Sequence, residues 1–174
     1  MKKIYLFLLP VILLGSAAFA QNVSTTVGGL WSAPATWVGG VVPVSTDNVI
    51  IADGATVIID IAAVANSLVR GQGVSGVLQY ESVTPRTLTV GSNVTISSGA
   101  SCLTGAAGSV TTHLLSLSGN STNSGTIDFA LGTAGTNISF TGSSNSLVSG
   151  SAGTVNLYSI TPAKAAVTQE IEFN

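Results

Sequence analysis

A phrase of two short apolar runs joined by a Gly-Ser corner returns along the chain, and this repetition constrains the fold more than any other feature. It reads TLTVGSNVTISSGAS, LLSLSGNSTNSGTIDFA and ISFTGSSNSLVSGSAGTVNL at its three clearest occurrences. From Leu68 to Leu88, Leu115 and Ile138 the steps are roughly twenty to twenty-seven residues, which is the period typical of solenoid repeats. One such unit cannot bury its apolar residues alone, whereas stacked units bury them as a continuous ladder.

The local sequence favours strands nearly everywhere. Glu, Lys, Arg and Gln are scarce while β-branched residues and Gly are abundant, so helix propensity is poor. The one stretch with helical character is DIAAVANSL, for which we expect a turn of helix or a crossover loop. Strands are expected near residues 48–52, 56–60, 67–71, 77–81, 87–91, 93–97, 114–119, 125–130, 137–142, 145–150 and 154–160.

These patterns predict an all-β protein, a right-handed parallel β-helix (β-solenoid) with an N-terminal cap. Each strand would pair with its counterpart one coil later, with Gly and Asn at corners that need left-handed backbone. A β-sandwich is the alternative, because many short strands with frequent turns also fit that fold. A sandwich, however, gives no reason for the phrase to repeat.

The first twenty residues have the pattern of a signal peptide. Lys2 and Lys3 precede the apolar stretch IYLFLLPVILLG, and the small-residue motif AFA stands before Gln21. An uncleaved N-terminal anchor is the alternative, which the cleavage motif disfavours. No later stretch is apolar for long enough to span a bilayer, so no second membrane segment is expected. We therefore expect residues 1–20 to be a signal peptide, 21–48 a cap segment and 49–174 the solenoid coils, continuing beyond Asn174 in a longer protein.

Charge argues against two classes of partner. Removal of residues 1–20 leaves three basic residues against seven acidic ones, a formal net charge of −4. Without a basic stripe, nucleic acid and anionic lipid are poor partner candidates. We expect an exported protein, extracellular or at the outer cell surface, with no stable membrane span after signal cleavage. Its single cysteine, Cys102, is expected to be a buried small hydrophobe.

The start of the mature chain holds both tryptophans, Trp31 and Trp37, together with Pro34 and Pro43. An end coil of a solenoid has an open edge and an exposed core, so atypical capping sequence is expected there. Large rings would cover the core and prolines would withhold backbone donors at the edge. The alternative is that Trp31 and Trp37 form a ligand site on which a sugar stacks.

The stretch WSAPATWVGGVVPVSTDNVIIADGATVIID, followed by SLVRGQGVSGVLQY, resembles the start of G8 domains. The same opening is familiar in large secreted or surface-attached β-helical repeat proteins of Gram-negative bacteria. The resemblance implies a β-helical or all-β extracellular module that contacts ligands or glycans. It carries over no catalytic residue.

Little in the chain points to catalysis or to a cofactor. Asp47, Asp53 and Asp60 are the densest acidic group, and their spacing does not make them converge as the paired carboxylates of a glycosidase must. A calcium site built from these three carboxylates and loop carbonyls is the more favourable reading. His113 has no second ligand nearby in sequence, while Tyr80, Glu81 and Arg86 suggest a small polar patch.

We therefore expect a non-catalytic, exported, adhesin-like β-solenoid module. Its Ser/Thr/Asn-rich surface would contact glycans or a cell-surface protein, weakly at each site and strongly by multivalency. The alternatives are a polysaccharide-active β-helix enzyme, either a lyase or a hydrolase, and a passive spacer domain.

Overall fold

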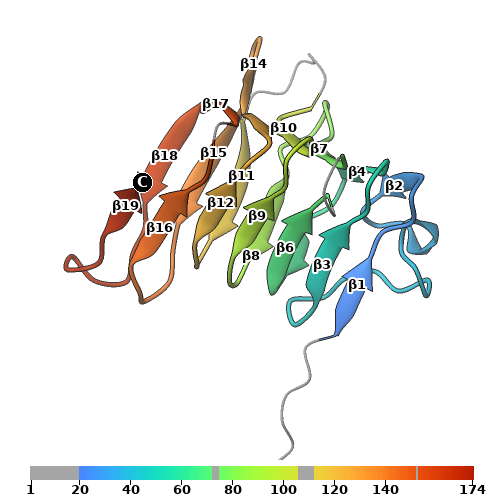
Figure 1. Cartoon of the computed structure of the whole chain (residues 1–174), viewed down its shortest axis with the longest axis horizontal. Coiled ribbons are helices and arrows are strands. Elements are labelled where there is room, and N and C mark those ends of the chain that lie inside the picture. Colours follow the sequence, from blue (N-terminus) through green and yellow to red (C-terminus); the bar gives the residue numbers. More distant parts are fainter. Residues whose placement is uncertain (1–19, 72–74, 106–111, 152) are drawn as a thin grey trace, which may run out of the picture.

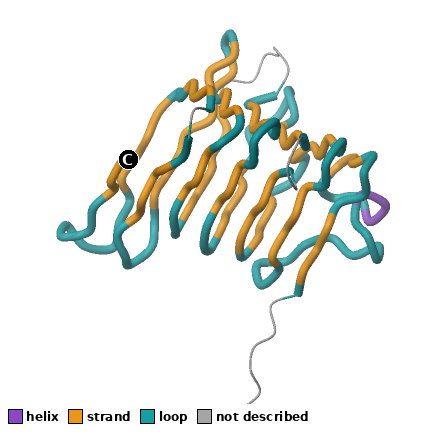
Figure 2. Tube along the Cα trace, viewed as in Figure 1, coloured by secondary structure: helices purple, strands orange, loops and turns teal. Residues whose placement is uncertain are grey.

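The computed structural model describes residues 20–71, 75–105, 112–151 and 153–174, so the expected signal peptide lies outside the described residues except for Ala20. The described chain winds into a parallel β-solenoid of about six turns, whose coils stack along one axis (Figure 1). The helical element among the described residues is one 3-10 turn, η1 (Pro34–Thr36); the other elements are strands (Figure 2). The predicted all-β solenoid is confirmed.

Each full coil supplies one strand to each of three sheets. The first sheet holds seven strands, in the order β1 (Gln21–Val23), β3 (Asn48–Ile51), β6 (Ser67–Arg70), β9 (Val94–Ile96), β12 (Ser121–Asn123), β16 (Ser146–Ser149) and β19 (Ile171–Phe173). The second sheet holds six, in the order β2 (Gly28–Leu30), β4 (Thr56–Ile59), β7 (Val77–Tyr80), β10 (Ser101–Leu103), β13 (Thr126–Asp128) and β17 (Thr154–Asn156).

The third sheet runs through β5 (Ala63–Ala65), β8 (Thr87–Val90), β11 (Thr112–Leu117), β15 (Ala134–Phe140) and β18 (Ser159–Pro162). A short strand, β14 (Ala130–Leu131), folds back antiparallel on the start of β15 and projects from the stack (Figure 1). The segment 21–48 contributes β1 and β2 to two sheets, and the third sheet begins only with β5 of the following coil.

Pairing between coils distinguishes the solenoid from a sandwich. Among the described strands, every pairing from one coil to the next is parallel, and antiparallel contacts are confined to β14–β15 and to an isolated bridge between Ser24 and Trp37. A β-sandwich is built from antiparallel sheets. The alternative fold is therefore excluded.

The register explains the repeat found in the sequence. Leu88 pairs with Leu115 and Leu115 with Ile138 in the third sheet, so these three stack in one column as their spacing predicted. Leu68 belongs to a different column, between Val49 and Val94 in the first sheet. The step from Leu68 to Leu88 is therefore not a repeat, because these two residues lie in β6 and β8 on two sides of the same coil.

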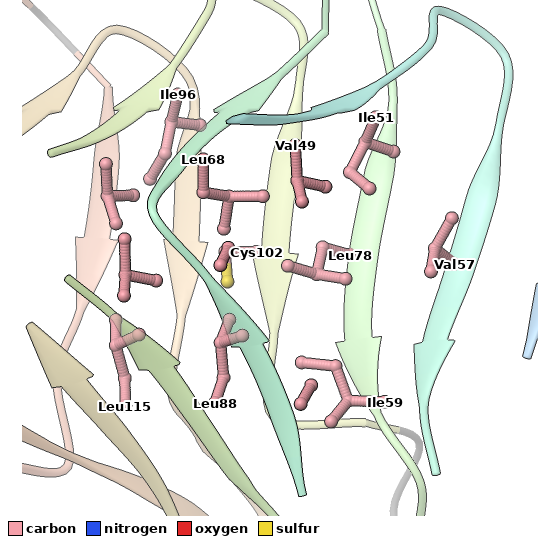
Figure 3. Packing of buried hydrophobic residues seen from close by; sticks show 14 of the residues in the cluster. Val49, Ile51, Val57, Ile59, Leu68, Leu78, Leu88, Ile96, Cys102 and Leu115 are labelled. Carbon is pink, nitrogen blue, oxygen red and sulfur yellow. The ribbon is translucent and has the colours of Figure 1, made fainter. Parts of the chain in front are cut away.

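Alternation of side chains fills the interior. Strands of all three sheets follow a buried/half-buried pattern with a period of two, as in β4, β6 and β7. Their inward residues form one apolar cluster, in which Cys102 takes the position after Val57 and Leu78 (Figure 3). Cys102 is therefore the buried small hydrophobe that the sequence predicted.

One local expectation was wrong. The stretch DIAAVANSL forms neither a helical turn nor a loop but the strand β5, which pairs with β8. Its alanines follow the same alternation, since Ala63 and Ala65 are buried and Val64 is half-buried. Register with the neighbouring coil overrides the helical preference of Ala at this position.

Candidate functional site

The outer face of the third sheet presents a line of hydroxyl groups. Thr89, Ser116, Ser139 and Thr161 come from β8, β11, β15 and β18, and each is the register partner of the next. We call these four residues the hydroxyl row. Because paired strands lie about 4.8 Å apart, the row repeats at that spacing along the solenoid axis.

The same alternation that buries the core exposes this row. In β8, Leu88 and Val90 are buried while Thr89 between them is exposed. Ser116 and Ser139 are half-buried, and Thr161 is exposed. A polymer lying along the axis would meet one hydroxyl per coil, each able to donate and to accept a hydrogen bond.

A second line of residues flanks the hydroxyl row, two positions earlier on the same strands. It consists of Thr87, Leu114, Asn137 and Ser159, again in register. Ser159 Oγ donates a hydrogen bond to Asn137 Oδ1 in the preceding coil. Side chains two positions apart on one strand are separated by about 6.6 Å, so the two lines form a regular, mainly polar grid.

Asparagines at the turns that precede strands of the first sheet stabilise the stacking of coils and do not form part of the outer polar grid. Asn93 Oδ1 accepts a hydrogen bond from the backbone N–H of Asn120 (2.9 Å), and Asn120 Oδ1 accepts one from the N–H of Leu147 (2.9 Å). Each amide thus connects its coil to the next. Asn93 and Asn120 are therefore engaged within the stack, whereas the hydroxyl row faces outward.

The two tryptophans lie inside the molecule. Trp31 is 0% exposed and Trp37 is 2% exposed, and both belong to the apolar cluster. A sugar ring cannot stack on either indole in this arrangement, because no ring face is open to solvent. Their position in the first coil, where the third sheet has no strand, supports the capping interpretation.

The three aspartates proposed as calcium ligands each hold a loop. Asp47 Oδ2 accepts a hydrogen bond from the N–H of Val44 (3.0 Å), and Asp53 Oδ1 accepts one from the N–H of Ser75 (3.1 Å). Asp60 accepts from both the backbone N–H and the hydroxyl of Ser32. Across the described part of the chain, no three His, Cys, Asp or Glu side chains gather where they could hold a metal ion.

The expected polar patch of Tyr80, Glu81 and Arg86 is divided between surface and interior. Arg86 and Glu81 form an ion pair with partly exposed side chains. Tyr80 is buried, stacks on His113 with ring centroids 4.6 Å apart, and donates its hydroxyl proton to the carbonyl oxygen of Leu114 (3.0 Å).

His113 is a buried link between coils. Its Nδ1 accepts a hydrogen bond from the N–H of Arg86 (3.1 Å), which places the proton of the neutral ring on Nε2. Burial lowers the pKa of His113, against the opposing effect of Glu81. This histidine is therefore a neutral structural group at neutral pH.

Sequence reasoning missed the most unusual side chain of the interior. Arg70 ends β6, and its side chain is 1% exposed. The signal was present in the alternation of SLVR, which places Arg70 on the same face as the buried Leu68. Because arginine is rarely buried without a partner, Arg70 was not expected to face the core.

The fold and its outer face define this protein as a parallel β-solenoid with a repeating hydroxyl surface. Comparisons with protein-family models, with curated proteins and with solved structures found no match. Among the described residues, no helix has the length and apolar character needed to cross a membrane.

Proposed function

We propose that this protein is a non-catalytic, exported β-solenoid module that binds extended glycans at the cell surface through the hydroxyl row, in the manner of an adhesin. The observation that carries the proposal is the in-register line Thr89–Ser116–Ser139–Thr161. Four equivalent donors and acceptors at a constant spacing suit a polymer that is itself periodic. Each contact is weak, and the repeat supplies the affinity by multivalency.

Two further features support an extracellular binding module. The signal-peptide pattern of residues 1–20 agrees with export. The likeness of residues 31–80 to G8 domains agrees with glycan contact outside the cell. The low content of charged side chains, 7% of the residues, leaves hydroxyl and amide groups as the main polar chemistry of the surface.

The test is a glycan array probed with the purified protein and two matched variants. Thr89→Val with Thr161→Val removes two hydroxyls of the row at nearly constant volume. Thr95→Val with Thr122→Val makes the same change on the first sheet, where these two threonines are register partners. We expect the row variant to lose affinity about thirtyfold, since it removes two hydrogen bonds that each contribute a net of about 1 kcal/mol, and the control variant to bind as the parent does.

Equal losses in both variants would refute the role of the row. If no glycan binds the parent protein, the passive spacer becomes the better assignment. Release of new reducing ends or unsaturated sugars from a bound polysaccharide would favour the polysaccharide-active enzyme.

A further inference from the structure

The interior of the stack is incompletely filled toward its C-terminal end. A cavity of about 420 Å³ lies inside the last coils, with walls that include Leu115, Ile138 and Phe140. Its lining reaches Val155 and Phe173, which are 52% and 58% exposed, so the cavity is not fully enclosed. A volume of this size is within the range of small-molecule sites, about 300–1,000 Å³.

The cavity exists because the inward columns of the first sheet change character. One column runs Val49, Leu68, Val94 and then Ser121. The column beside it runs Ile51, Arg70, Ile96 and then Asn123. Ser121 and Asn123 are buried polar residues where the preceding coil places Val94 and Ile96, and both line the cavity.

Arg70 also lines this cavity, and no described carboxylate pairs with its charge. Its Nε and Nη1 atoms are buried and have no hydrogen-bond partner among the described residues. The ion pair found between described residues is Arg86–Glu81. The segments that the structure does not describe contain no Asp or Glu, so they bring no carboxylate side chain to Arg70.

The neighbouring ionisable groups do not neutralise Arg70 either. Burial raises the pKa of the Tyr80 hydroxyl and of the Cys102 thiol. The charge of Arg70 opposes both effects, and a side-chain interaction of Arg70 with Cys102 further opposes the second, without reversing either. Both groups are therefore uncharged at neutral pH. A buried, unpaired cation is costly, which makes this part of the cavity strongly attractive to an anion.

Asn123 is the second lining residue with an unpartnered polar atom, and this atom is also a hydrogen-bond donor. Asn123 Oδ1 accepts a hydrogen bond from the N–H of Gly125 (3.1 Å), while Nδ2 is buried without a partner among the described residues. Arg70 and Asn123 are two coils apart in one column, roughly 10 Å along the axis at their Cα atoms. Both residues line the same cavity. The unpartnered polar atoms of the lining are thus all donors.

We propose that this cavity is a binding site for an organic anion with an apolar body, such as a medium-chain fatty acid. Its carboxylate would accept hydrogen bonds from Arg70 and Asn123, and its apolar part would lie against Leu115, Ile138 and Phe140. Charge-assisted bonds from a guanidinium to a carboxylate are the strong class of hydrogen bond. This site is independent of the hydroxyl row, which lies on the outer surface.

The test compares decanoate with decanol, two ligands that differ in the charged head, below their micellar concentrations. Isothermal titration should show one decanoate bound per chain, at least tenfold more tightly than decanol, with a rise in Tm on binding. Arg70→Met keeps a long side chain and removes the charge, so it should abolish the preference for decanoate. Arg86→Met removes a surface arginine and should leave binding unchanged.

A second variant keeps the test decisive if Arg70→Met fails to fold. Ser121→Leu fills the cavity from its wall and leaves Arg70 in place, so a folded Ser121→Leu protein should lose decanoate binding. Equal binding of decanoate and decanol by the parent, or decanoate binding that survives Ser121→Leu, would overturn the proposal. So would a parent protein that dimerises through this end and takes up no decanoate, because a second copy would then be the occupant.

Discussion

Trp37 donates its indole N–H to the backbone carbonyl oxygen of Trp31 over 2.9 Å, and the two rings meet edge to face with centroids 5.0 Å apart. The hydrogen bond fixes the loop that contains η1, while the rings fill the core of the first coil. Trp31 and Trp37 lie on either side of η1, in a stretch of the chain that supplies no strand to the third sheet. Both rings belong to the apolar cluster of the solenoid.

Truncation of Trp37 should therefore weaken folding. We expect Trp37→Ala to lower the free energy of unfolding by about 3–5 kcal/mol, as for other large buried aromatic side chains. Urea unfolding followed by circular dichroism measures the change. Val38→Ala is the control, because Val38 is 65% exposed. A Trp37→Ala protein of unchanged stability that no longer binds glycans would identify the indole as a ligand site.

Substitution of two glycines distinguishes the stability cost of backbone strain from the cost of a steric clash. Gly28 has φ +76°, and a Cβ there would lie 2.1 Å from the carbonyl oxygen of Thr56, whereas Gly39 has φ +91° and open space around it. We expect Gly39→Ala to cost about 1 kcal/mol and Gly28→Ala to cost several times more, because the β2–β4 pairing must shift. Thermal unfolding of both variants tests this difference. Equal losses in Tm would show that the close approach of β2 to β4 has no energetic weight.

The single histidine gives folding a specific pH dependence. Burial lowers the pKa of His113 in the folded state, so the unfolded chain binds a proton at higher pH than the folded protein does. Stability from this group is complete above the unfolded pKa of about 6.5 and is lost as pH falls below that value toward the folded pKa.

Urea midpoints measured between pH 8 and pH 5.5 should therefore fall in the parent protein. His113→Gln keeps an acceptor for the N–H of Arg86 and removes the titration, so its midpoint should change much less over this range. A parent midpoint that stays constant down to pH 5.5 would contradict the assignment of a buried neutral imidazole.

Calcium is expected to have little effect on stability. Asp47 and Asp60 already accept hydrogen bonds from loop N–H groups, and calcium ligation would have to replace those bonds. The Tm should therefore be the same with added calcium and with a chelator. A rise in Tm that saturates with calcium, and that Asp47→Asn or Asp60→Asn abolishes, would restore the calcium site.

Processing gives a test of the expected export. Signal peptidase reads small residues at the positions occupied by Ala18 and Ala20. The protein recovered outside the producing cell should begin at Gln21, as N-terminal sequencing or intact mass would show. Replacing Ala18 with Arg should block cleavage and retain the longer chain with the cells.

The sequence predicted the solenoid because its inward columns are strongly patterned. Leu88, Leu115 and Ile138 revealed the period directly, and they do stack in register. The strands β10 and β12 escaped prediction because they are three residues long and read SCL and STN. Such short strands, with few β-branched residues, form only because the coils on either side supply pairing partners.

The hydroxyl row and the cavity needed the structure for different reasons. The row depends on which residues of successive coils are register partners, and a slip of one position would turn every hydroxyl inward. The cavity depends on Arg70 facing the core, against the usual preference of arginine for the surface. In both cases the sequence contains the residues but does not show which of their side chains point to the same side of the solenoid wall.

The parallel register has a consequence for how such a chain changes in length. Val94 and Ser121 occupy equivalent places in adjacent coils, so loss of residues 94–120 would splice one coil onto the place of another. The shortened rod would lose about 4.8 Å and would keep every remaining outward residue on its own face. Removal of one whole coil is therefore expected to shorten the molecule without changing the direction in which its remaining side chains face.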